Sequence, residues 1–152
     1  MKPIKVGLLG LGTVGTGVVR IVNGHREDLY RQSGTEIRIE KILVKHLDKA
    51  RSIDVDRSML TDNPQEILAN PDIDVVVEVM GGIEPAKSYI LAAIEKGKHV
   101  VTANKDLMAL HGTEILTKAA ERHCDIFYEA SVAGGIPIIR TLIDGFSSDR
   151  IT

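Results

Sequence analysis

The sequence has few of the residues on which several kinds of protein depend. Its 152 residues include one cysteine (Cys124), no tryptophan, three tyrosines and two phenylalanines. One cysteine builds neither an internal disulfide nor a cysteine-based metal site, and this fits a reducing compartment. With aromatic residues at 3%, a surface that stacks on bases is not expected, and the core must be aliphatic.

Neither sign of charge is in excess, and long hydrophobic runs are missing. Lysine and arginine total 19 and aspartate and glutamate total 21, a formal net charge of −2. Because nucleic-acid-binding domains usually carry a basic face, we expect no nucleic-acid partner. No apolar run approaches the length of a membrane span, and the first residues lack the apolar stretch of a signal peptide. We therefore expect a cytoplasmic protein with no membrane partner, and the length suits one domain.

Apolar strand-like runs alternate with helix-like stretches along the whole sequence. Strands are predicted over residues 4–9, 37–44, 74–80, 99–102 and 125–129. Helices are predicted over residues 13–31, 65–70, 85–96, 106–110, 113–123 and 137–145, and the highly charged residues 46–57 form a loop or a solvated helix turn. This alternation predicts an α/β fold, a doubly wound and mostly parallel sheet with right-handed crossovers.

A glycine-rich motif, GLGTVG, lies between the first predicted strand and the first predicted helix. Gly10 allows a tight turn, Gly12 lets the backbone approach a pyrophosphate, and Gly15 allows close helix-to-strand packing. The N-terminus of the helix offers free N–H groups to the phosphates. Because strand and helix flank the motif, it predicts a Rossmann-type dinucleotide-binding domain rather than a glycine turn without a ligand.

The end of the second predicted strand bears on the choice between NAD and NADP. No carboxylate that could bind a ribose 2′-hydroxyl appears there before Asp48. The same stretch holds four cations, Lys41, Lys45, Lys49 and Arg51. They are either a solvated loop or partners for a 2′-phosphate, and we favour NADP(H) with NAD(H) possible.

Three more loops follow predicted strands, at the edge where ligands bind in such folds. The stretch around Gly81 either brings backbone close to a cofactor or makes a simple turn. Thr102 and Lys105 place polar groups beyond a buried strand, where the lysine either holds a substrate oxygen, joins a proton relay or is an ordinary surface residue. The loop over residues 129–137 is rich in small residues, and by itself it is best interpreted as a tight crossover rather than a cation site.

Taken together, these motifs resemble homoserine dehydrogenase. GLGTVG at 10–15, EVMGG at 78–82, TANK at 102–105 and EASVAGGIPII at 129–139 occur in that family's order and spacing. The last two are far more specific than the glycine motif, and the resemblance covers the chain but only the family's nucleotide-binding half. That family interconverts L-homoserine and L-aspartate 4-semialdehyde with NADPH or NADH, on the route to threonine, methionine and isoleucine.

The resemblance implies roles for individual residues. It implies phosphate contacts at Gly12, Thr13 and Val14, a 2′-phosphate contact at Lys45, and a catalytic role for Lys105 near the nicotinamide and substrate. It also implies a monovalent cation, typically sodium, on main-chain oxygens of Glu129, Val132, Gly134 and Ile136. The full set of candidate cofactor-binding residues is Gly10, Leu11, Gly12, Thr13, Val14, Gly15, Lys45, Gly81, Thr102 and Lys105. Cys124 and the five histidines match no catalytic position.

The resemblance also sets expectations for the domain organisation. We expect residues 1–152 to be the NAD(P)-binding domain, with the substrate-binding and dimerising region absent from this chain and no aspartate kinase domain before it. Such a chain is expected to bind cofactor with little or no turnover, while the complete enzyme acts on a small molecule and is a homo-oligomer. The alternatives are a dehydrogenase of a related amino acid and a non-catalytic NAD(P)-sensing module.

Overall fold

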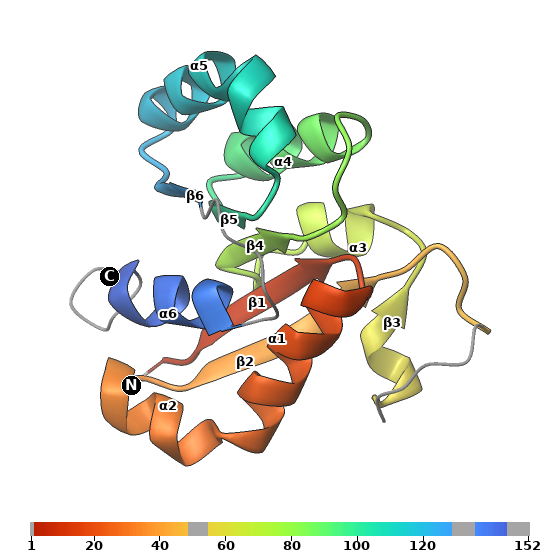
Figure 1. The fold of residues 1–152 in the computed structure, drawn as a ribbon, viewed down its shortest axis with the longest axis vertical. Helices are drawn as coiled ribbons and strands as arrows, with labels where there is room; N and C mark the ends of the chain where they lie inside the picture. Colours follow the sequence, from red (N-terminus) through yellow and green to blue (C-terminus); the bar gives the residue numbers. More distant parts are fainter. Residues whose placement is uncertain (1, 49–54, 129–135, 146–152) are drawn as a thin grey trace.

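A parallel sheet forms the centre of the molecule, with helices on both of its faces (Figure 1). This computed structural model describes residues 2–48, 55–128 and 136–145. Within them the strands are β1 (Ile4–Leu9), β2 (Ile37–Leu43), β3 (Leu60–Thr61), β4 (Val75–Glu78), β5 (His99–Thr102) and β6 (Ile126–Tyr128). The helices are α1 (Thr13–Gly24), α2 (Arg26–Ser33), α3 (Gln65–Leu68), α4 (Ala86–Glu95), α5 (Lys105–Glu121) and α6 (Ile136–Gly145), with a 3₁₀ helix η1 (Arg57–Met59).

The strand order is β3-β2-β1-β4-β5-β6, and each neighbouring pair is parallel. The chain builds one half of the sheet outward from β1 and then returns to build the other half outward from β4. The order therefore reverses between β1 and β4, and in folds of this kind ligands bind beyond the carboxyl ends of the strands at that point. The predicted doubly wound α/β fold is confirmed.

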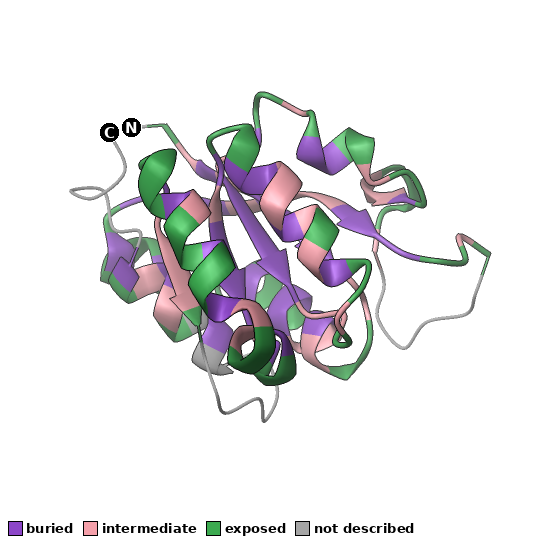
Figure 2. Cartoon of the chain, turned by 90° about the horizontal axis from the view of Figure 1, so that it is seen from above, coloured by how far each residue is buried: buried purple, intermediate pink, exposed green. Residues whose placement is uncertain are grey.

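Aliphatic side chains fill the space between the sheet and each helical layer. One cluster packs α1, α2 and α6 on the sheet through residues such as Val18, Leu29 and Leu142. The other packs α3, α4 and α5 through residues such as Ile90 and Ile115. Strand β4 is buried along its whole length, and Figure 2 shows the buried strands between the partly exposed helices. No described helix is both long and apolar enough to cross a membrane.

The helix predicted over residues 13–31 is two helices in the structure. It breaks at His25, whose φ of −131° and ψ of 38° are not helical. Gly24 before the break has a low helix propensity. The change of direction lets Leu29 of α2 bury against the sheet, so core packing outweighs the continuous helical periodicity.

The two helices predicted over residues 106–110 and 113–123 are one helix, α5. Gly112 does not interrupt it. A glycine inside a helix costs about 1 kcal/mol relative to alanine. Leu107, Ile115 and Ala119 are buried on either side of it, and their packing outweighs that cost.

The segment between β2 and α3 holds two elements that the sequence pattern did not predict, η1 and β3. Strand β3 is two residues long and pairs with Ile42 and Leu43 of β2. The register between β1 and β2 also shifts by one residue after Ile39, so Glu40 and Lys41 are both half-buried instead of alternating. This shift breaks the period of two on which strand prediction relies.

Candidate dinucleotide-binding site

The glycine turn connects the end of β1 to the start of α1 at the point where the strand order reverses. Gly10 has a φ of +109°, which side chains rarely tolerate. A Cβ on Gly15 would lie 2.4 Å from the carbonyl oxygen of Gly10, so only glycine fits there. A Cβ on Gly12, in contrast, would meet no atom within 4 Å. The protein itself therefore requires Gly10 and Gly15, while Gly12 keeps an open surface bare.

The N-terminus of α1 is suited to hold an anion. Gly12 is its N-cap and provides no side-chain hydrogen bond, and the first turn contains no acidic residue. The first N–H groups of a helix have no partner within the helix, and the helix dipole adds a partial positive charge. Thr13 is exposed beside them, while Leu11 and Val14 are half-buried against the core. An open glycine turn with uncapped N–H groups fits a bound pyrophosphate.

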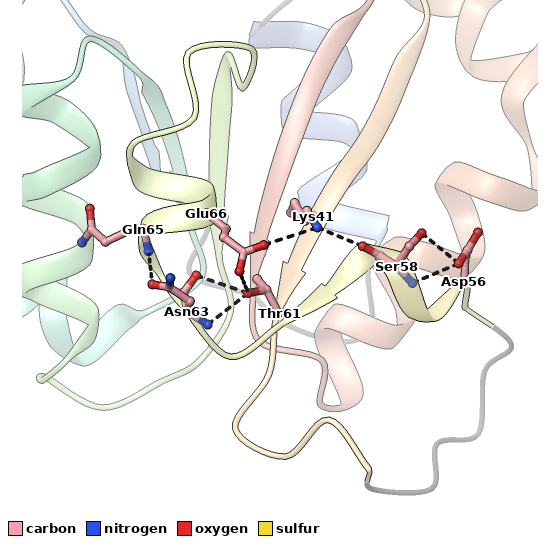
Figure 3. Close-up of polar contacts among 7 residues, drawn as sticks. All are labelled: Lys41, Asp56, Ser58, Thr61, Asn63, Gln65 and Glu66. Carbon is pink, nitrogen blue, oxygen red and sulfur yellow. Dashed lines mark hydrogen bonds and ion pairs between the residues drawn. The ribbon is translucent and has the colours of Figure 1, made fainter.

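Lys41 is engaged in the protein's own structure. Its Nζ donates to the carbonyl oxygen of Ser58 at 2.9 Å and lies 3.4 Å from Oε1 of Glu66 (Figure 3). Lys41 thereby ties the segment that contains η1 and β3 to strand β2. Of the four cations considered for a 2′-phosphate, Lys41 thus has another role, and Lys49 and Arg51 lie outside the described residues.

Lys45 lies just after β2 and is exposed. No side chain in the described parts of the chain pairs with its ammonium group. Nearby, Asp48 is paired with Arg57. Because Asp48 is engaged in that pair, Lys45 stays open to a ligand among the described residues that follow β2.

The loop between β3 and α3 is held by short-range polar contacts (Figure 3). The Thr61 hydroxyl donates to Oε2 of Glu66 at 2.8 Å and accepts from the Asn63 backbone N–H at 3.0 Å. On the other side of β3, Asp56 accepts from the backbone N–H and then the hydroxyl of Ser58, and these bonds lower the pKa of the Asp56 carboxyl. Thr61 itself is buried, but the Glu66 side chain is 48% exposed and the Asp56 contacts are exposed, so water screens both carboxylates.

The ends of β4 and β5 are joined by the carboxylate of Glu78, the first residue of the EVMGG motif, for which the sequence predicted no role. Glu78 is fully buried, and its Oε1 accepts from the Thr102 hydroxyl at 2.6 Å. Its Oε2 accepts from the backbone N–H groups of Met80 at 2.9 Å and Gly81 at 3.1 Å. The only sequence signal for it was a charge at the end of an all-valine strand.

Asn104 holds the start of α5, next to Lys105. Its Oδ1 accepts from the Leu107 backbone N–H at 3.1 Å, which caps the helix, and its Nδ2 donates to the carbonyl oxygen of Gly82. Lys105 is the first residue of α5 and is exposed. No described side chain pairs with its ammonium group, which leaves it accessible beside the glycines at the end of β4.

Strand register brings these groups to one edge of the sheet. Leu9 of β1 pairs with Glu78 of β4, and Glu78 pairs with Thr102 of β5. A Cβ on Gly10 would approach Met80 at 3.3 Å, so the glycine turn touches the chain that follows β4. The glycine turn, the 80–82 turn and the start of α5 therefore lie next to one another beyond the strand ends.

Comparison with known proteins shows the family in which this arrangement occurs. The family model described as "Homoserine dehydrogenase, NAD binding domain" matches residues 10–129. The chain belongs to the homoserine dehydrogenase family. The match spans the glycine turn, Glu78 and Lys105, and it confirms a nicotinamide-dinucleotide-binding domain.

Other members of the family are similar to this chain over nearly its whole length. The Bacillus subtilis homoserine dehydrogenase is 56% identical over 152 residues, which is 100% of this chain and 35% of that protein. The crystal structure of a homoserine dehydrogenase from Thiobacillus denitrificans has a TM-score of 0.78 and 46% identity, covering 95% of this chain and 33% of that one. For the crystal structure of the S. aureus homoserine dehydrogenase at pH 7.0 the TM-score is 0.80 at 41% identity, and the match covers 86% of this chain and 33% of that one. The chain thus spans about a third of the length of these relatives.

Two predictions from the family resemblance remain, the cofactor contact of Thr102 and the cation-binding positions. Thr102 is fully buried with its hydroxyl on Glu78, so a contact between Thr102 and the cofactor stays a prediction. Of the cation-binding positions, Glu129, Val132 and Gly134 lie outside the described residues, and Ile136 is the first residue of α6. In the described residues, no three His, Cys, Asp or Glu side chains gather into a metal site.

Proposed function

We propose that this chain is the NADP(H)-binding domain of an enzyme that interconverts L-homoserine and L-aspartate 4-semialdehyde. The supporting observation is the bare surface at Gly12, where a Cβ would meet no atom within 4 Å, in front of the N-terminus of α1, which no side chain caps. When bound, the nicotinamide supplies hydride transfer to and from the substrate carbon. The chain's residues bind and orient it, and residues 1–152 form this domain.

Lys105 is the residue that we propose acts on the substrate oxygen. Its ammonium group lies at the first position of α5, where a positive charge opposes the helix dipole and costs roughly 0.3–1 kcal/mol. A lysine placed there does not serve the stability of the helix. In the proposed role it stabilises the developing alkoxide oxygen of the substrate by charge and hydrogen bonding. In the complete enzyme, Lys105→Gln then lowers turnover without lowering thermal stability.

Lys45 supports the preference for NADP(H). It is exposed at the end of β2, no carboxylate of the described residues neutralises it, and a ribose 2′-phosphate would give it a charge-assisted hydrogen bond. Titration with NADPH and NADH compares the wild type with Lys45→Ala. We expect the variant to lose about 1.5–3 kcal/mol of NADPH binding and none of NADH binding.

The control is Lys96→Ala, which removes an exposed lysine at the C-terminal end of α4, on the opposite edge of the sheet. It should leave both affinities unchanged. If Lys45→Ala weakened NADPH and NADH equally, Lys45 would not contact a 2′-phosphate. If the wild type bound neither cofactor, the proposed function itself would be rejected.

We further propose that residues 1–152 alone turn over homoserine slowly or not at all, since the relatives are about three times as long. A steady-state assay of homoserine oxidation by the 152-residue chain tests the turnover, and the same assay on the complete enzyme, with aspartate for comparison, tests the substrate. Homo-oligomerisation and a sodium ion on the main chain at Glu129, Val132, Gly134 and Ile136 are proposed for the complete enzyme. Cofactor titrations in sodium and in choline chloride at equal ionic strength test the cation.

A further inference from the structure

We propose that Glu78 is a positioning residue that holds the two loops of the nicotinamide half of the site in place. This inference rests on the proposed function, because it assigns Glu78 a purpose in cofactor binding. Its basis is a ring of hydrogen bonds that starts and ends at one fully buried carboxylate.

The first part of the ring fixes the turn after β4. Oε2 of Glu78 accepts from the N–H groups of Met80 and Gly81, two and three residues further along the chain. Gly81 and Gly82 both have positive φ, 78° and 76°. The turn is therefore set by two backbone N–H groups that converge on one oxygen, and it presents Gly81 and Gly82 to the solvent.

The second part fixes the chain after β5. Oε1 of Glu78 accepts from the Thr102 hydroxyl, which in turn accepts from the Asn104 N–H at 3.0 Å. Asn104 then donates from Nδ2 to the carbonyl oxygen of Gly82, so the ring closes on the turn after β4. The orientation of each donor depends on the carboxylate, because both of its oxygens act only as acceptors.

The burial of this carboxylate argues for a role in the site. Glu78 is the one buried carboxylate among the described residues. A buried charge is costly, and neutral polar groups could anchor a turn at lower cost. In a doubly wound sheet each half holds one mononucleotide, and the loops after β4 and β5 belong to the half opposite the adenosine. The ring thus fixes the surface that faces the nicotinamide, and it holds the residue next to Lys105.

The experiment compares two nucleotides on the 152-residue chain. NADPH contains both halves of the cofactor, while adenosine 2′,5′-bisphosphate contains only the adenosine half. Glu78→Gln removes the charge, and its side-chain nitrogen cannot accept a hydrogen bond, so either the Thr102 hydroxyl or the two backbone N–H groups lose their acceptor. We expect NADPH affinity to fall at least about tenfold, with a changed fluorescence of the bound reduced nicotinamide, while the affinity for adenosine 2′,5′-bisphosphate changes less than about twofold.

A second pair of variants keeps the test decisive if Glu78→Gln does not fold. Thr102→Val keeps the shape but removes the hydroxyl, and should show the same selective loss; Thr102→Ser keeps the hydroxyl and should restore NADPH binding. The control is Thr35→Val, which removes an equally buried hydroxyl before β2 that donates to the Lys2 carbonyl oxygen at 3.1 Å. It should lower stability without separating the two nucleotides.

The results that would overturn this inference differ from the result that would reject the proposed function. Loss of both nucleotides to the same degree would make Glu78 a purely structural residue and overturn the inference. Unchanged NADPH binding in Glu78→Gln and in Thr102→Val would overturn it as well. A wild type that binds neither nucleotide would instead reject the proposed function, and with it the inference.

Discussion

The two halves of the sheet hold their ligand-facing loops by different means, although each uses a threonine paired with a glutamate. In the β1–β3 half the Thr61 hydroxyl donates to Glu66, whose side chain is 48% exposed and also meets Lys41. In the β4–β6 half the Thr102 hydroxyl donates to Glu78, which is fully buried. The same chemical pair is screened by water in one place and unscreened in the other.

This difference matches what each half is proposed to bind. In the proposed complex the adenosine would lie over an exposed rim, where Lys45 would meet a phosphate in solvent. The nicotinamide must be held still against a substrate, since misplacement of the reacting atoms by about 1 Å costs much of the rate. A buried network is rigid because breaking any one bond leaves unpaired groups away from water.

The largest expected effect comes from removing the two carboxylates. Glu78→Ala should destabilise the chain by about 3–5 kcal/mol, because the Thr102 hydroxyl and two backbone N–H groups lose their buried partner. Glu66→Ala should cost under about 1 kcal/mol, as for other surface pairs. Urea denaturation followed by circular dichroism measures both. Equal losses would mean that the two networks are equally rigid, and the contrast between the halves would not hold.

The second prediction concerns Lys98, at the opposite edge of the β4–β6 half. Lys98 is buried, and its Nζ donates to the carbonyl oxygens of Asn70 and Ile73. Burial lowers its pKa, with Asp74 opposing that shift. A lysine pKa that is lower in the folded than in the unfolded chain penalises folding below the folded pKa, and the penalty disappears as pH rises toward the ordinary value of about 10.4.

Wild-type stability should therefore rise relative to Lys98→Met as pH increases from 8 toward 10.4, by at most about 1.4 kcal/mol per pH unit. Urea denaturation at each pH measures the difference. A wild type that loses stability relative to Lys98→Met over this range would show that the buried lysine is stabilised in its charged form.

The strand-and-glycine framework of the site was predictable from the sequence because it depends on local patterns. This framework lies within a dozen residues: the apolar run of β1, the three glycines and the first residue of α1. Each of these features is recognisable from its own residues. The polar stretch that ends in Lys105 was found in the same way, as a loop after a buried strand.

The connections within the site were not predictable because they join residues far apart in the chain. Glu78 and Thr102 are separated by 24 residues, and only the register of β4 and β5 brings them together. Lys41 belonged to a run of cations in the sequence, yet a register shift in β2 turns it toward Glu66. A two-residue strand such as β3 has no periodicity to detect.

The third prediction compares the two asparagines that precede helices in the two halves. Asn104 caps α5 and also donates to Gly82, whereas Asn63 accepts from the Gln65 N–H at 3.0 Å in an exposed loop. Asn104→Ala should cost about 1–2 kcal/mol, as expected for a buried cap, and Asn63→Ala about 0.5 kcal/mol, because its contact is an exposed one before the N-cap Pro64. Thermal denaturation compares them. A larger loss for Asn63→Ala would place the more rigid loop in the β1–β3 half.

The smallest effect is expected from two helical glycines, and it has the opposite sign. A Cβ on Gly112 would meet only the Met108 methyl, at 3.7 Å, which is ordinary van der Waals contact, and a Cβ on Gly24 would meet nothing within 4 Å. Gly112→Ala should stabilise the chain by about 0.5–1 kcal/mol, since it lies inside α5 and alanine restricts the unfolded chain. Gly24→Ala, at the last residue of α1, should gain less because helix ends fray. Loss of stability in Gly112→Ala would show that α4 and α5 need the bare backbone at this point, and the rigidity of the β4–β6 half would then extend from the buried ring into its outer helices.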